Sequence, residues 1–426
     1  MREMKDSGIE WIGQIPKHWE VHPVYAYFEE GKTKNYRMQE HNLLSLSYGR
    51  IIRKDINTNG GLLPASFNTY NVVEAGDIII RPTDLQNDKR SLRTGLVKEQ
   101  GIITSAYIDL RPKDNVNSKY YHYLLHSYDV IKVFYNMGNG VRQGLNFSEF
   151  AKLLLLEPTT VEQQQIADYL DTKCSEIDAT AEDIQKEISL LEDYKKSVIT
   201  EAVTKGLNPD AEMKDSGIEW IGEVPKHWGT IRIGNAFSIR NERNYLPMEQ
   251  VQLLSLYSGK GVFPTGEEGT TNRGNHAQTV ADYKIVKKND IVVNIILAWM
   301  GSLGISNYNG VVSPAYDVYI PNEEKVVPHY YHYVFRTSGI ANECYRYGRG
   351  IMMMRWRTYS SEFKRIHVPF PPLEEQQQIA DYLDSKCSEI DAIIADKKRQ
   401  RGILTEYKKS LIYEYVTGKK EVPVHE

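Results

Sequence analysis

The chain has 426 residues, 41% of them hydrophobic, which is enough for two or three domains with buried cores. Its cysteines, Cys174, Cys344 and Cys387, are too few and too scattered for a disulfide framework or a Cys-X-X-Cys metal site, so a reducing cytoplasm is expected. The net charge of −4 does not exclude a nucleic-acid partner, because the negative charge is concentrated in one segment. Residues 162–192 carry −7, and the remainder of the chain sums to +3.

An internal repeat organises the whole chain. The opening motif MKDSGIEWIGQIPKHW at Met4 returns as MKDSGIEWIGEVPKHW at Met213. Three further motifs recur in the same order: LLSL at Leu43 and Leu253, YYHY at Tyr120 and Tyr330, and EQQQIADYLD at Glu162 and Glu375. The sequence therefore predicts two similar halves, each a globular unit followed by a long helical segment.

Within each globular unit, short apolar runs are punctuated by Gly, Asn and Pro, and a helix carrying YYHY follows them. This pattern predicts an α/β or α+β domain of about 150 residues. The apolar run that begins at Ile291 is far too short to span a membrane and is predicted to be a buried strand. The expected division is two globular domains, two helical spacers and a tail: 1–157, 158–207, 208–370, 371–418 and 419–426.

Each long segment shows an a/d heptad pattern. The apolar seam positions are Leu170, Ile177, Ile184, Leu191 and Val198 in the first segment and Leu383, Ile390, Leu404 and Leu411 in the second. Lys397 and Arg401 interrupt the second seam without an evident reason. Prolines before each segment and Gly206 and Gly418 after them predict abrupt helix ends. Two such stripes in one chain favour an antiparallel intramolecular coiled coil over packing on separate partners.

Stretches that imitate catalytic motifs are better explained structurally. SPAY at Ser313 lacks the second proline of a methyltransferase loop. The triad Glu323, Glu324 and Lys325 downstream of Asp317 imitates a metal-dependent nuclease core, but it lies in a polar, proline-flanked turn. His122 and His332 sit among tyrosines at helical spacing, which is typical of packing. No phosphate-binding Gly-rich loop and no Cys/His cluster with metal spacing is present in the sequence. We expect a non-catalytic chain without a cofactor or metal of its own.

Loops that differ between the halves carry side chains able to read base edges, since Arg pairs with guanine and Asn or Gln with adenine. In the second half, residues 348–363 are three longer than their counterpart, residues 138–150. The candidate DNA-binding residues are Arg81, Lys89, Arg90, Arg93, Arg142, Gln143 and Asn146 in the first half and Arg346, Arg349, Arg355 and Arg357 in the second.

The opening motif, the two EQQQIADYLD helix starts and the tandem order of globular unit and helix resemble the specificity subunit of type I restriction-modification systems. The resemblance covers essentially the whole chain. It places Trp11, Pro16, Trp19 and their repeats Trp220, Pro225 and Trp228 in the family framework.

This resemblance implies two target recognition domains that read a bipartite double-stranded DNA site. It also implies helices that separate the domains and dock two modification subunits, which bind S-adenosylmethionine and methylate adenine, with restriction subunits joining to cleave DNA. The repeat is then a fused pseudo-dimer. The alternative is a coiled-coil scaffold or antitoxin-like relative that does not bind DNA, and methyltransferase activity on this chain comes third.

Overall fold

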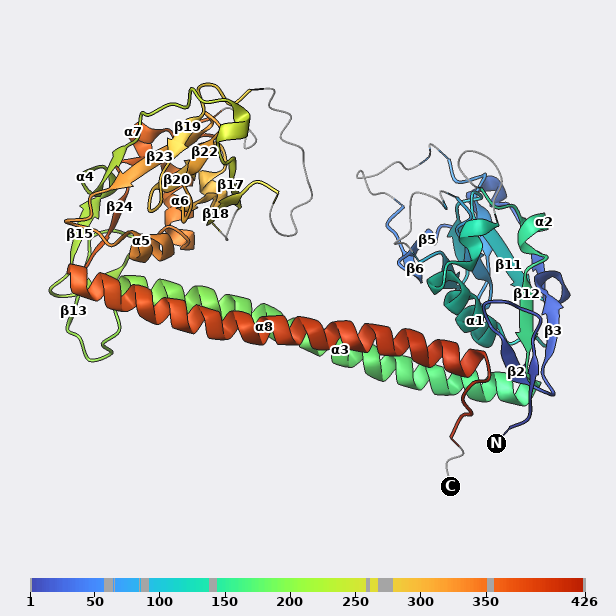
Figure 1. The fold of residues 1–426 in the computed structure, drawn as a ribbon. Helices are drawn as coiled ribbons and strands as arrows, with labels where there is room; N and C mark the ends of the chain where they lie inside the picture. The colour runs from blue at the N-terminus through green and yellow to red at the C-terminus, as the bar shows by residue number, and fades with distance from the viewer. Residues whose placement is uncertain are drawn as a thin grey trace. The chain divides into compact units, whose positions relative to one another are not determined.

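The computed structural model describes residues 2–56, 64, 66–83, 85, 92–137, 144–257, 261–266, 279–350 and 356–423 (Figure 1). The fold consists of two compact units: residues 1–185 with 399–426 form unit 1, and residues 186–398 form unit 2. Each unit combines one globular region with part of both long helices. The sequence-based division differs in treating each helix as a separate domain.

Both units are built around a four-stranded antiparallel sheet with the same topology. The order is β4-β11-β8-β9 in unit 1 and β16-β23-β20-β21 in unit 2. These strands are β4 (Phe28–Glu30), β8 (Ile78–Ile80), β9 (Thr94–Leu96), β11 (Ile108–Pro112), β16 (Phe237–Ile239), β20 (Ile291–Asn294), β21 (Leu303–Ile305) and β23 (Tyr316–Pro321). Their shared order gives most positions of one unit a structural equivalent in the other.

Short antiparallel strand pairs surround each sheet. Those of unit 1 are β1 (Met4–Asp6) with β2 (Gln14–Pro16), β3 (Glu20–Pro23) with β12 (Leu154–Glu157), β5 (Leu44–Ser47) with β6 (Arg50–Arg53), and β7 (Asn71–Val73) with β10 (Gly101–Ile103). Those of unit 2 are β13 (Met213–Asp215) with β14 (Glu223–Pro225), β15 (Gly229–Arg232) with β24 (His367–Phe370), β17 (Leu254–Tyr257) with β18 (Gly261–Pro264), and β19 (Lys284–Val286) with β22 (Gly310–Val312). The repeat seen in the sequence is therefore a repeat of strand pairing.

The YYHY motifs lie on helices α1 (Ser118–Val130) and α5 (Pro328–Val334), and their first two tyrosines are completely buried. The Asn117 side chain caps the start of α1, and Pro328 occupies the first turn of α5. The other short helices are α2 (Phe147–Phe150), α4 (Ile233–Ala236), α6 (Ser338–Tyr347) and α7 (Ser360–Phe363). The 3₁₀ turns are η1 (Val24–Ala26), η2 (Tyr36–Met38), η3 (Val133–Asn136), η4 (Met248–Gln250) and η5 (Ala298–Met300).

The two long helices are α3 (Thr160–Lys205, 46 residues) and α8 (Leu373–Val416, 44 residues). Gly206 follows α3 with a φ of 75°, and Gly418 lies just beyond α8 with a φ of 68°. Such left-handed backbone favours glycine and ends a helix. Both helices end where the sequence indicated. None of the described helices is both long and apolar enough to cross a membrane.

Within each unit the two long helices pair antiparallel. In unit 1, Lys408 of α8 forms a 2.7 Å ion pair with Asp178 of α3, and the rings of Tyr169 and Tyr415 lie 4.6 Å apart. In unit 2, the ion pairs are Lys195 with Asp391 at 2.5 Å and Lys397 with Glu187 at 2.5 Å. Residue numbers rise along one helix as they fall along the other, so the predicted antiparallel coiled coil is confirmed. The salt bridge also explains the cation at position 397 in the apolar seam.

Burial along the seam is greatest where the helices join the globular cores. Leu170, Ile184, Leu383, Ile390 and Leu411 are buried. The remaining seam positions, Ile177, Leu191, Val198 and Leu404, are half-buried. The core of unit 1 takes in the first turns of α3 and the last turns of α8, and the core of unit 2 takes in the opposite ends. Each globular region is thus fused to the helix pair through one apolar core.

Candidate functional site

A basic and aromatic surface lies at the end of helix α6 in unit 2. Arg346 and Arg349 expose 65% and 71% of their side chains, and Arg357 is also exposed. The backbones of Arg349 and Arg357 exchange two N–H···O bonds of 2.9 Å, so these residues face each other at the base of the longer loop. Three of the sequence-predicted arginines are therefore brought together.

Aromatic stacking holds this surface in shape. The rings of Tyr345 and Trp356 stack at 5.1 Å with 22° between their planes, and Trp356 donates its indole N–H to the Tyr345 carbonyl. A Cβ on Gly348 would lie 2.3 Å from Trp356 Nε1, so only glycine allows this approach. The ring stack and this hydrogen bond therefore fix the conformation at the base of the loop in the free protein.

The surface carries more positive than negative charge. Glu343 pairs with Arg346, while Glu362 pairs with both Arg349 and Arg365. The Arg365 guanidinium lies 5.5 Å from the centre of the Tyr347 ring. Counting Arg357, the described residues of this surface include four arginines and two glutamates. Its net positive charge suits binding to the phosphate backbone of a nucleic acid. Sequence reasoning missed Arg365, because only the fold brings it beside α6.

In unit 1, Arg93 is predicted from the sequence to contact DNA, but it has a structural role instead. Arg93 is completely buried, and its guanidinium donates to the carbonyls of Arg81 and Thr83 at 3.4 and 2.6 Å. Its backbone N–H donates to the buried Asp129 carboxylate. The prediction of Arg93 as a DNA contact is therefore wrong, because its side chain is buried and bonds the carbonyls of Arg81 and Thr83. Arg81 is half-buried beside it.

Asn146 caps a helix, and its role in DNA binding stays a prediction. Its side-chain oxygen accepts hydrogen bonds from the Glu149 N–H at 3.0 Å and the Ser148 hydroxyl at 2.6 Å, in a capping box at the start of α2. Adenine readout needs that same oxygen as an acceptor, so the cap competes with it. The other predicted contacts, Lys89, Arg90, Arg142, Gln143 and Arg355, lie outside the described residues.

The histidines of the YYHY motifs do not resemble ligands. Burial lowers the pKa of His122 to about 3 and that of His332 to about 3, so both rings stay neutral. Among the described residues, the group closest to a metal-ligand arrangement is Glu20, His22 and Glu157 on the β3–β12 pair. Its histidine already pairs with both carboxylates, at 3.0 and 3.3 Å, and a cross-strand ion-pair cluster accounts for it.

Each opening motif packs against the end of the long helix from the other half of the sequence: the first motif against α8 and the second against α3. Trp19 is completely buried beside Gly418 at the end of α8, and Trp228 packs in the same way beside Gly206 at the end of α3. The buried tyrosines Tyr120 and Tyr330 bond the final helical turns through the carbonyls of Val416 and Val203, at 3.0 and 2.8 Å. These two assemblies are called corner 1 and corner 2, in units 1 and 2.

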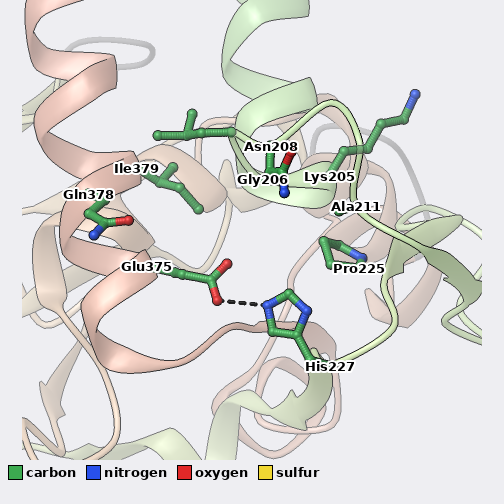
Figure 2. Close-up of a pocket in the computed structure, with 10 residues that line it drawn as sticks. Lys205, Gly206, Asn208, Ala211, Pro225, His227, Glu375, Gln378 and Ile379 are labelled. Atoms are coloured by element: carbon green, nitrogen blue, oxygen red, sulfur yellow. Dashed lines mark hydrogen bonds and ion pairs between the residues drawn. The ribbon is translucent and has the colours of Figure 1, made fainter.

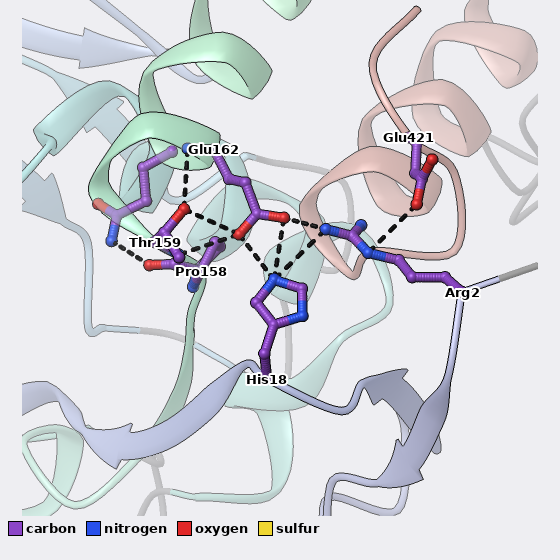
Figure 3. Close-up of polar contacts among 7 residues, drawn as sticks. Arg2, His18, Pro158, Thr159, Glu162 and Glu421 are labelled. Atoms are coloured by element: carbon purple, nitrogen blue, oxygen red, sulfur yellow. Dashed lines mark hydrogen bonds and ion pairs between the residues drawn. The ribbon is translucent and has the colours of Figure 1, made fainter.

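Corner 1 is closed by ion pairs (Figure 3). Arg2 bonds to Glu162 at the start of α3 and lies 3.3 Å from Glu421 of the tail. His18 approaches the same Glu162 carboxylate at 3.0 Å. Glu162 also accepts from the Thr159 N–H and hydroxyl as a capping box.

Corner 2 has the same frame but contains a pocket of about 370 Å³ (Figure 2). Glu375 accepts from His227 at 2.7 Å and from the Trp228 indole N–H at 2.9 Å. The pocket is lined by Lys205, Gly206, Leu207, Asn208, Ala211, Pro225, His227, Glu375, Gln378 and Ile379.

Residues 225–400 match the type I restriction modification DNA specificity domain family. The specificity subunit assigned to type I restriction enzyme MjaX of Methanocaldococcus jannaschii is 27% identical over 321 residues, covering 74% of this chain and 71% of that protein. The chain is similar to the specificity subunits of type I restriction-modification systems, as the resemblance in its sequence predicts. The MjaVIII specificity subunit of the same organism is 24% identical over 338 residues, which cover 76% of this chain and 75% of that protein.

A chain from a solved structure of a type I R-M system shares the fold of this protein. Its TM-score is 0.66 at 13% identity, with 95% of this protein and 99% of that chain covered. The expected fold class, two tandem globular domains of mixed helix and strand with two long paired helices, is confirmed. The relatives are named as specificity subunits of type I restriction enzymes, in agreement with the resemblance found in the sequence.

Proposed function

We propose that this subunit reads a bipartite double-stranded DNA target, one half-site with each unit, and holds two methyltransferase subunits. The modification subunits would carry S-adenosylmethionine, restriction subunits would join for cleavage, and the complex would act in the cytoplasm. The observation that carries the proposal is that the two units share the same sheet topology and the same corners but have different loops. The repeated corners suit two identical protein partners, and the different loops suit two different base sequences.

The arginine surface of unit 2 supports DNA binding. Exposed guanidiniums can contact phosphates as well as guanine edges, and the flanking Tyr345–Trp356 stack limits the conformational freedom that binding would remove. The alternative, a coiled-coil scaffold without DNA binding, leaves the positive surplus of this surface without a role.

A gel shift on mixed-sequence duplex DNA, with the modification subunit present, tests the proposal. Affinity should fall steeply as salt rises, because phosphate contacts release counterions. Replacing Arg349 and Arg357 together with Ala should weaken binding and reduce the salt slope by about two, roughly one per phosphate contact.

The matched control removes two lysines from the acidic helix α3, Lys173 and Lys196, each of which pairs with an acid three residues away. This double Ala variant should bind DNA like the unaltered chain. Binding that is absent, or insensitive to salt, would favour the scaffold function.

A further inference from the structure

We propose that the pocket of corner 2 is a receptor for a guanidinium group, namely an arginine side chain of the protein partner that docks on unit 2. The inference rests on the proposed scaffolding function and extends it with a specific site. Its basis is a comparison between the two corners of the same chain.

The backbones around the two corners are equivalent. Lys17 donates its N–H to the Glu3 carbonyl at 2.8 Å, and Lys226 donates to Glu212 at 2.7 Å. The side chains of these residues repeat the relation, with ion pairs of 2.8 and 2.9 Å. Glu3 follows Arg2 and Glu212 follows Ala211, so Ala211 stands where corner 1 has Arg2.

In corner 1 the arginine fills the space between the opening motif and the long helices. Arg2 pairs with Glu162 and Glu421, and its guanidinium lies 5.8 Å from the centre of the Trp19 ring. Only 24% of the Arg2 side chain is exposed. Corner 1 therefore shows, within this protein, the ligand chemistry that the frame accepts.

Corner 2 keeps the acceptor and lacks the internal arginine. Glu375 is the equivalent of Glu162; 33% of its side chain is exposed, and it lines the pocket. A carboxylate has about four lone-pair sites, so Glu375 can accept a guanidinium N–H in addition to His227 and Trp228. The pocket volume of about 370 Å³ is within the range of small-ligand sites.

The other charged side chain of the pocket does not occupy the acceptor. In Figure 2 the Lys205 ammonium extends away from Glu375, while Ala211 and Asn208 border the space in front of it. Pro209 stands at the position of Glu421, so a bound guanidinium would have one carboxylate instead of two. This difference suits a reversible contact with a partner.

Isothermal titration of the full chain with N-acetyl-arginine amide tests the site directly. We expect one saturable site in the unaltered chain, none in Ala211→Arg, which supplies the side chain internally, and two in Arg2→Ala, which opens corner 1. Glu375→Gln should weaken binding about tenfold, the usual effect of losing a charged hydrogen-bond acceptor. Neutral N-acetyl-citrulline amide should not bind.

Glu219→Arg is the matched control, since it introduces an arginine at an exposed residue of the same motif that does not line the pocket. It should bind the probe normally. If Arg2→Ala fails to fold, the comparison of the unaltered chain with Ala211→Arg still decides. Absent binding, or binding unchanged by Ala211→Arg, overturns the site.

The second arm measures assembly with the modification subunit. Ala211→Arg should weaken docking on unit 2 about tenfold or more, whereas Glu219→Arg should not. Equal assembly of Ala211→Arg and the unaltered chain would refute a partner arginine, even if the free probe binds. An unaltered chain that does not bind the modification subunit would instead refute the proposed function.

Discussion

In each unit a buried aspartate lies directly before an inner strand of the sheet, β8 or β20, and its arginine counterion comes from a different position in the two units. In unit 2, Arg240 bonds Asp290 through two nitrogens, at 2.7 and 2.9 Å. In unit 1 the equivalent acid, Asp77, pairs with Arg111 at 3.4 Å. The repeated fold thus preserves a buried ion pair while moving its cation to another strand.

The rearrangement leaves unit 1 with a second buried acid, Asp109, where unit 2 has the apolar Val318. Gly31 replaces the arginine of unit 2, and a Cβ there would lie 1.9 Å from the Asp109 carboxylate. Burial and the neighbouring Asp77 charge raise the pKa of Asp109 to about 7, an effect that Arg111 only partly offsets.

Replacing Asp109 with Asn should therefore change how stability depends on pH. Because the folded-state pKa is raised, the folded chain holds this proton between about pH 4 and pH 7, where the unfolded chain has lost it. Stability falls with rising pH across that window and levels off above it. Urea unfolding from pH 5 to pH 8 should show a shallower decline for Asp109→Asn. Parallel profiles would show that Asp109 ionises normally in the fold.

At the scale of elements, the glycines that end the long helices face unequal surroundings. Both have left-handed backbone, which costs a side chain about 1 kcal/mol or more. A Cβ on Gly418 would also lie 2.5 Å from Pro16 Cδ, whereas a Cβ on Gly206 would lie 3.1 Å from Trp228. The two ends are alike in conformation and different in packing.

We expect Gly418→Ala to destabilise the chain more than Gly206→Ala does, by about 2–4 kcal/mol against about 1–2 kcal/mol. The free energy of urea unfolding measures both losses. Equal losses would indicate that Pro16 moves aside without cost.

At the scale of the whole molecule, helix length is expected to set the separation of the two DNA segments. The sequence suggests adding one heptad in each helix, between Leu191 and Val198 and between Leu404 and Leu411. The antiparallel pairing corrects the second position: the ion pairs of Glu187 with Lys397 and of Lys195 with Asp391 place the segment around Leu191 opposite residues 391–397. An insertion after Ile394 is therefore the one that faces an insertion after Leu191.

With these facing insertions, both seams stay in phase and the helices lengthen by about 10 Å, from 1.5 Å per residue. We expect the preferred spacer to grow by about three base pairs, at roughly 3.4 Å each, while the bases within each half-site stay the same. Methylation mapped on a library with randomised spacers measures the change. Affinity falls as well, because three pairs rotate one half-site by about a third of a turn.

A seven-residue replacement that keeps helix length is the control and should leave the spacer unchanged. An unchanged spacer in a folded insertion variant would mean that the helices act as docking platforms and do not measure distance.

The sequence by itself determined the repeat, the α+β class, the helix ends at Gly206 and Gly418, and the antiparallel pairing of two apolar seams. These features depend on local chemistry: glycine ends helices, and periodic apolar side chains require a partner surface. The tertiary structure alone decided that Arg93 is internal, that Asn146 caps a helix, that Lys397 meets Glu187, and that Ala211 borders a pocket. Each of these depends on contacts with another element of the fold, and a residue's type does not reveal whether its neighbours in space leave it exposed, buried or paired.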